Sequence, residues 1–133
     1  MKIVIDTNLL VAYMFNKSSA SSKIIDLAEK GAVSVMWHRK IRAEAELITG
    51  KITSAVPHTE IDLNMIFREE NEVKEIPVIE NGSEDPEDDK FLACAIAAGA
   101  EMIVSNDKHL LDLNIFKGIP IYTSGKAFTI INQ

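Results

Sequence analysis

Short apolar runs alternate with longer segments of helical spacing along this 133-residue chain, and this alternation constrains the fold more than any other feature. The runs that we expect to form strands are Lys2–Ile5, Val33–Trp37, Glu75–Ile79, Met102–Val104 and Ile119–Thr123. Pro77 limits the third of these to an edge or irregular strand, because proline donates no ladder hydrogen bond. Strands that alternate with helices form βαβ units and pair in parallel. We therefore expect an α/β fold with three layers, α/β/α, around a mainly parallel central sheet.

Segments with helical spacing fill the intervals between these runs. They are Ser19–Lys30, Arg39–Thr49, Thr59–Glu72, Glu87–Ala98, Lys108–Leu113 and Gly125–Ile131. Gly31, Gly50 and Gly99 follow three of them and indicate C-terminal stops. Asp85 followed by Pro86 is typical of a helix start, with the aspartate as N-cap and the proline at the first helical position. No repeat or linker divides the chain, so we expect one domain over residues 1–133.

The composition excludes several classes of protein. With 47% hydrophobic and 26% charged residues, the chain is neither disordered nor collagen-like, and its one cysteine, Cys94, excludes a disulfide scaffold. No apolar run approaches the length of about 20 residues that a membrane span needs. The first strand meets Asp6 too early to be the core of a signal peptide. We therefore expect a cytoplasmic protein with no membrane partner.

The charge of the chain is unevenly distributed. Twenty acids against fourteen bases give a net charge of −6, which argues against broad electrostatic binding of nucleic acid. Ten of the acids and only one base, Lys74, lie between Glu69 and Asp89. Most of such a run is typical of a solvated face or loop. The informative acids are therefore those at the ends of the predicted elements.

Two acids follow predicted strands. Asp6 comes directly after Ile3–Ile5, and Asp107 comes shortly after Met102–Val104. The carboxyl ends of parallel strands meet at one edge of a sheet, and ligand sites of open α/β sheets lie outside that edge. We expect these two carboxylates to lie close together.

Asp89 is a third candidate, because it opens a helix whose next residues on the same face are Leu92, Ala93 and Ile96. A carboxylate at the margin of such an apolar face needs a partner. The alternative is stabilisation of the helix dipole by acids in the first turn, which accounts well for Glu87 and Asp88.

Glu44 is a fourth candidate, since it shares a helix face with Ile41, Leu47 and Ile48. It is either a ligand or one half of a partly buried ion pair with a neighbouring base. The bases within reach along the chain are Arg39, Lys40 and Lys51.

Carboxylates that gather at one edge repel one another unless a cation lies between them. Ligand sets made only of oxygen suit hard cations such as Mg²⁺ or Mn²⁺, and three histidines with one cysteine make a poor zinc site. Divalent ions in an open carboxylate cluster are suited to phosphodiester hydrolysis.

Four stretches, taken in order, resemble the PIN-domain nucleases. They are Asp6-Thr7-Asn8, an acid in the helix Arg39–Thr49, Asp89-Lys90-Phe91-Leu92-Ala93-Cys94-Ala95, and Ser105-Asn106-Asp107. The resemblance runs from Lys2 to about Phe128. Ala97–Ala100 and Gly118–Ile121 fit the bacterial and archaeal branch that includes toxins of toxin–antitoxin pairs.

The resemblance implies a metal-dependent ribonuclease. In such a nuclease the catalytic acids that bind Mg²⁺ or Mn²⁺ would be Asp6, Glu44, Asp89 and Asp107. It implies supporting roles for Asn8 beside the first aspartate and for Ser105 beside the last, and Asp88 could assist or replace Asp89. The start of the helix Arg39–Thr49 departs from the family pattern, so Glu46 stays an alternative to Glu44.

The implied partners are single-stranded or structured RNA and, for a toxin, a small antitoxin protein that blocks the site. A homodimer is usual for such folds. The bases that could hold the RNA backbone, or that simply carry surface charge, are Arg39, Lys40, Lys90 and Lys108.

Three other functions compete with this one. The first is a catalytically degenerate PIN-like binding or regulatory module, which would have lost one of the acids. The second is a phosphotransferase of the haloacid-dehalogenase type, which would need an acid where Asn8 stands. The third is a receiver domain, which would need adjacent acids where Asp6 stands alone.

Overall fold

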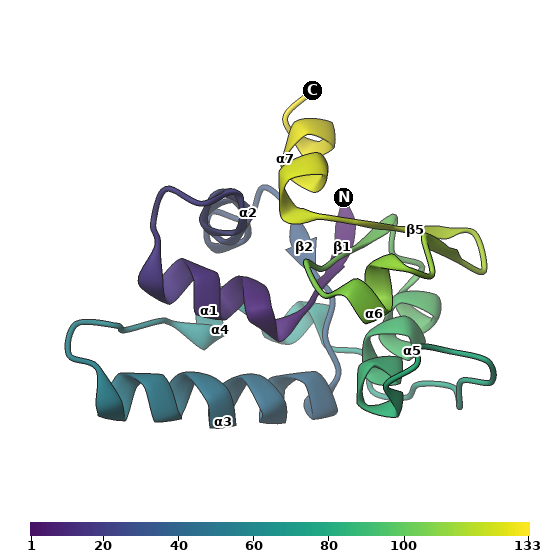
Figure 1. Cartoon of the computed structure of the whole chain (residues 1–133), viewed down its shortest axis with the longest axis horizontal. Helices are drawn as coiled ribbons and strands as arrows, with labels where there is room; N and C mark the ends of the chain where they lie inside the picture. The colour runs from purple at the N-terminus through teal and green to yellow at the C-terminus, as the bar shows by residue number, and fades with distance from the viewer.

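Five strands form one sheet in the order β2-β1-β3-β5-β4 in the computed structural model, which describes residues 1–133 (Figure 1). The strands are β1 (Lys2–Ile5), β2 (Ser34–Val35), β3 (Met102–Val104), β4 (Ile115–Phe116) and β5 (Ile119–Tyr122). Parallel pairing joins β2, β1, β3 and β5, and β4 is antiparallel to β5. The prediction of a mainly parallel sheet is confirmed.

Helices cover the sheet on both faces. They are α1 (Thr7–Phe15), α2 (Ala20–Glu29), α3 (Arg39–Ala55), α4 (Leu63–Ile66), α5 (Asp89–Ala98), α6 (Lys108–Leu111) and α7 (Ser124–Ile131), with 3₁₀ turns η1 (Glu69–Asn71) and η2 (Pro86–Asp88). The connections β1-to-β2 and β2-to-β3 run in opposite directions along the sheet, so right-handed crossovers place their helices on opposite faces. Figure 1 shows α5 on one side of the strands and α7 with α2 on the other. The expected three-layer α/β/α fold is confirmed.

The core is one cluster of buried apolar side chains centred on β1 and β3. Every residue of β3 is buried, as are the last three residues of β1, which is the pattern of a parallel strand covered on both faces. Phe91 and Leu92 of α5 pack into this cluster and are almost fully inaccessible to solvent. No helix in the structure combines the length and the apolar character that crossing a bilayer demands.

The helix predicted to stop before Gly50 continues to Ala55. Glycine costs a helix interior about 1 kcal/mol relative to alanine, but it ends a helix only where the backbone turns left-handed. Gly50 keeps ordinary helical φ, whereas Gly31 and Gly99, with φ of 77° and 65°, do end α2 and α5 as predicted.

The predictions for residues 59–79 were also wrong. Of the helix predicted over Thr59–Glu72, only α4 and the 3₁₀ turn η1 form, and the strand predicted over Glu75–Ile79 is absent. After η1 the chain is no longer helical and pairs with the backbone of Trp37. The Trp37 backbone N–H donates to the Asn71 carbonyl, and the Trp37 carbonyl accepts from the Val73 N–H. This tertiary pairing outweighs the local helical spacing.

Helix α1 was not predicted at all. Its sequence is apolar on almost every side, so it shows no polar stripe from which a helical period could be recognised. Strand β4, with only two residues, was also missed. The remaining elements lie within two residues of their predicted ends.

Asn106 joins the end of β3 to α7. Its side-chain oxygen accepts a hydrogen bond from the Ser124 N–H at 3.0 Å, and its amide nitrogen donates to Ser124 Oγ at 3.1 Å. We expect Asn106→Ala to lower the free energy of unfolding by about 1 kcal/mol, measured by urea denaturation, because these bonds are partly exposed. Asn132→Ala, which removes an exposed asparagine with no recorded side-chain hydrogen bond, is the control and should match wild type. Equal stability of both variants would contradict this account of Asn106.

Candidate metal centre

The connection from β1 leads to β2 on one side of it, and the next connection returns to β3 on the other side. Asp6 lies at the end of β1, between these two directions of the sheet. In the parallel register Ile5 pairs with Val104, and the Asp6 N–H continues the ladder by donating to the Val104 carbonyl at 2.9 Å. Asp6 and Ser105 are therefore neighbours at the carboxyl ends of two adjacent strands. Ser105 Oγ donates to Asp6 Oδ2 at 2.7 Å. The crevice at such a switch point is where open α/β sheets bind ligands.

Ser105 also holds the last aspartate. Its Oγ accepts a hydrogen bond from the Asp107 N–H at 2.9 Å, so one hydroxyl links both acids. Asp6 is the N-cap of α1 and accepts from the Asn8 N–H at 3.2 Å. Asn8 thus touches Asp6 through its backbone, and its side chain has no recorded hydrogen bond. Asp107 caps α6 by accepting from the His109 N–H at 2.8 Å.

Glu44 reaches the same region from α3. Its Oε2 accepts from Thr7 Oγ1 at 2.5 Å, and its Oε1 is 3.2 Å from the ammonium of Lys90. Its charge acts on Asp6. Glu46 lies on another face, is largely exposed, and pairs with Arg42 at 2.9 Å. The structure therefore brings Glu44, and not Glu46, near Asp6.

The two adjacent aspartates at the start of α5 point to different places. Asp89 Oδ1 accepts from the Ser83 N–H at 3.0 Å, and a methyl group at Gly82 would overlap the Asp89 carboxylate. Asp89 therefore holds the loop before the helix. Asp88 is buried, and its charge is coupled to those of Asp107 and Asp6. Of this pair, the structure brings Asp88 to the cluster.

Ordinary helical spacing could have indicated Asp88. The residues three, four and seven positions after it are Phe91, Leu92 and Ala95, which are all buried in α5. Ile96, seven positions after Asp89, is only half-buried. The buried face of α5 therefore continues to Asp88 more directly than to Asp89.

Burial and the charges of neighbouring acids raise the pKa of two of these carboxyls, Asp6 and Asp88. Burial raises the pKa of Asp6, the Ser105 and Asn8 hydrogen bonds oppose this rise, and the charges of Asp107 and Glu44 add to it. Burial, followed by the charges of Asp107, Asp6 and Asp85, raises the pKa of Asp88 to about 6. Perturbed carboxyls that face one another at a ligand-binding edge are typical of functional sites.

The donor set fits a hard divalent cation. Asp6, Glu44, Asp88 and Asp107 offer only carboxylate oxygens, which Mg²⁺ and Mn²⁺ prefer. Asp88 is 9% exposed, and its Oδ2 is inaccessible and has no hydrogen-bond partner. A buried carboxylate oxygen without a donor is unfavourable, and a cation shared with the neighbouring acids would remove this cost.

The candidate substrate-binding bases differ in their surroundings. Lys90 is directed inward, with its side chain 9% exposed and its ammonium also donating to the Glu87 carbonyl at 2.5 Å. Lys108 is exposed and pairs with Asp112 at 2.6 Å. Arg39 and Lys40 are exposed at the start of α3. Lys40 lines a groove of about 780 Å³ that Glu44 borders.

A PIN domain family model matches residues 2–109. The chain belongs to the PIN domain family. PIN domains are generally metal-dependent nucleases that use a cluster of acids, which agrees with the convergence of carboxylates beside β1 and β3. The match includes every acid of the cluster and ends before β4, β5 and α7. Comparison with curated proteins and with solved structures gives no match.

We expect Asp88→Asn to change how the stability of the metal-free protein depends on pH. The pKa of Asp88 is about 6 in the folded state, against the ordinary value of 3.8 that applies to the unfolded chain. At a pH between these two pKa values, folding therefore takes up a proton. Stability should therefore fall as the pH rises from about 4 to about 6. In EDTA at pH 7, urea denaturation should show Asp88→Asn more stable than wild type by about 1 to 2 kcal/mol, after allowing for solvent screening.

The neighbouring Asp89→Asn variant is the control for this measurement. It removes the same charge one residue along but also weakens the acceptor of the Ser83 N–H, so it should bring no gain in stability at pH 7. An Asp88→Asn protein whose stability follows the wild-type pH curve would place Asp88 outside the repulsive cluster.

Proposed function

We propose that this protein is a metal-dependent endoribonuclease that hydrolyses RNA phosphodiester bonds at the acid cluster. The observation that carries the proposal is the unpartnered, buried Oδ2 of Asp88 beside Asp6 and Asp107. Family membership supports a nuclease in general, and the all-oxygen donor set supports Mg²⁺ or Mn²⁺ as the ion.

The residues that would hold the ion are Asp6, Asp88 and Asp107, with Glu44 at the side of α3. A divalent cation there supplies a water nucleophile of lowered pKa and stabilises charge that develops on the phosphate. In this proposal Asp89 keeps the loop 82–83 in place and takes no part as a ligand, because its carboxylate is turned to the Ser83 N–H.

The other residues of the site act by positioning. Ser105 holds the Asp6 carboxylate and the Asp107 backbone through one hydroxyl, and Thr7 with Lys90 holds the Glu44 carboxylate. Locked carboxylates lose little conformational entropy when they bind an ion. Arg39 and Lys40 are the exposed bases nearest along the chain to Glu44, and we assign them to the RNA phosphates. Lys90 is held by Glu44 and is not assigned to RNA.

A role as the toxin of a toxin–antitoxin pair is a finer form of the same proposal. It depends on the resemblance of Ala97–Ala100 and Gly118–Ile121 to that branch of the family. The antitoxin, a homodimer and a cytoplasmic location belong to this finer proposal as well.

RNA cleavage by the purified protein tests the proposal. With Mn²⁺ and a mixed-sequence single-stranded RNA, we expect cleavage that EDTA stops and that Asp6→Asn lowers by about 100-fold or more, since even groups around metal ligands contribute 10- to 100-fold. Full activity of Asp6→Asn would overturn the proposed site. If wild type leaves the RNA intact and Mn²⁺ titration calorimetry gives the same curve for both proteins, the chain is a degenerate binding module.

Two matched pairs of variants test which acids belong to the site. Asp88→Asn should lower cleavage and Mn²⁺ affinity more than Asp89→Asn, because only Asp88 faces Asp6 and Asp107. Glu44→Gln should likewise lower cleavage more than Glu46→Gln, because Glu46 is occupied by Arg42. Circular dichroism checks that each variant is folded. A larger loss of cleavage in Asp89→Asn or in Glu46→Gln would show that this neighbouring acid is the ligand instead.

A further inference from the structure

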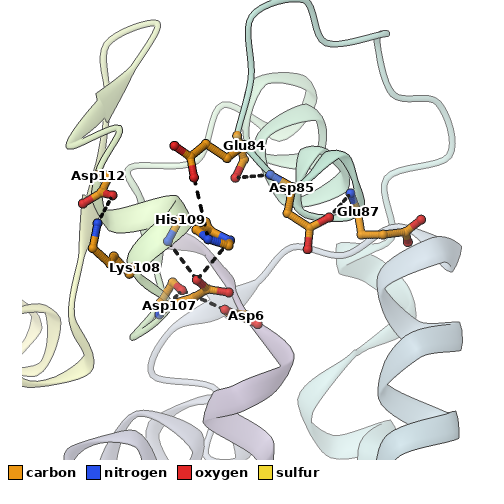
Figure 2. A network of polar contacts seen from close by, with 10 residues as sticks. Asp6, Glu84, Asp85, Glu87, Asp107, Lys108, His109 and Asp112 are labelled. Atoms are coloured by element: carbon orange, nitrogen blue, oxygen red, sulfur yellow. Dashed lines mark hydrogen bonds and ion pairs between the residues drawn. The ribbon is translucent and has the colours of Figure 1, made fainter.

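A second group of possible ligands lies on the outer side of the acid cluster. Asp85, Asp88 and His109 each offer one ligand atom, and these atoms all lie within 4.8 Å of one another. Asp85 is the N-cap of η2, and His109 comes from the first turn of α6. Figure 2 shows His109 between the loop that carries Glu84 and Asp85 and the pair Asp107 and Asp6.

One side chain in this group lacks a partner. Asp88 is 9% exposed, and its inaccessible Oδ2 accepts no hydrogen bond. The charges that act on it most are those of Asp107, Asp6 and Asp85, and all three repel it. Lys90 offsets this repulsion only in part, since its ammonium is bound by Glu44 and the Glu87 carbonyl. A cation beside Asp88 would offset this repulsion, and the Asp85 side is one of the two sides on which acids face Asp88.

The imidazole of His109 is not committed to a hydrogen bond. Its Nδ1 is 4.0 Å from Asp107 Oδ1, and its Nε2 is 3.8 Å from Glu84 Oε2, both beyond hydrogen-bond distance. One ring nitrogen can thus serve as a ligand, and the other has a carboxylate, of Asp107 or of Glu84, about 4 Å away. A carboxylate behind a histidine is the usual arrangement that orients a metal-binding imidazole.

We propose that Asp85, Asp88 and His109 form a second cation position that takes a divalent transition-metal ion in preference to Mg²⁺. Imidazole nitrogen binds first-row transition metals, whereas Mg²⁺ demands oxygen and keeps its water shell. Asp88 has two oxygens and would bridge this position and the oxygen-only site of Asp6 and Asp107. Shared carboxylates of this kind join ions about 4 Å apart in two-metal sites. The second position shares Asp88 with the proposed nuclease centre but does not depend on RNA cleavage.

Mn²⁺ added to the protein in excess Mg²⁺ tests this position, because Mg²⁺ fills the oxygen-only site and leaves the nitrogen-containing one. Pulsed electron paramagnetic resonance should show coupling of the bound Mn²⁺ to a histidine nitrogen in wild type. His109→Asn should remove this coupling and weaken Mn²⁺ binding by about tenfold or more. His58→Asn is the matched control, since it removes an exposed histidine in a residue with φ of 65°, which asparagine tolerates, and it should behave as wild type.

Two results would overturn the proposal. One is bound Mn²⁺ without nitrogen coupling in wild type, and the other is unchanged Mn²⁺ affinity in His109→Asn. Neither bears on the proposed nuclease, which is tested separately by cleavage in Mg²⁺ alone and by Asp6→Asn. Nitrogen coupling in a protein that cuts no RNA would support the second position and count against the nuclease.

Discussion

The pairing of β1 with β3 is the contact on which the candidate site depends. It continues one step beyond both strands, where Asp6 still donates to Val104, and it thereby makes Asp6 and Ser105 neighbours. The serine then fixes Asp107 as well. Both strands lie in the middle of the buried core, so the two strand-end aspartates are attached to its centre.

Around this fixed pair the protein accumulates negative charge that it only partly compensates. Backbone N–H groups at the starts of α1 and α6 face the aspartates, and Lys90 faces Glu44. These contacts leave Asp88 with a buried, unpaired oxygen and a pKa of about 6. The repulsion at Asp88 lowers the stability of the ion-free protein, and an ion bound there would restore it.

The sequence was sufficient for the layers, the parallel sheet and the meeting of Asp6 with Asp107, because strand ends in a parallel sheet share one edge. It favoured Glu44 over Glu46 as a ligand, which stays a prediction, and the structure places Glu44 against Thr7, next to Asp6. It favoured Asp89 over Asp88, whereas Asp88 is the one whose charge meets those of Asp107 and Asp6. The partner of Thr7, 37 residues away, had no signal in the sequence.

The order of the strands has a consequence for anyone who shortens the chain. The family match ends at residue 109, yet β5 pairs with β3 and its Tyr122 carbonyl accepts from the Ser105 N–H. A chain cut at that boundary would turn β3 into an open edge with an unsatisfied row of backbone groups, which is a template for aggregation. It would also free the backbone of Ser105, whose hydroxyl holds the Asp6 carboxylate and the Asp107 N–H. A folding unit that keeps this site therefore extends at least through β5.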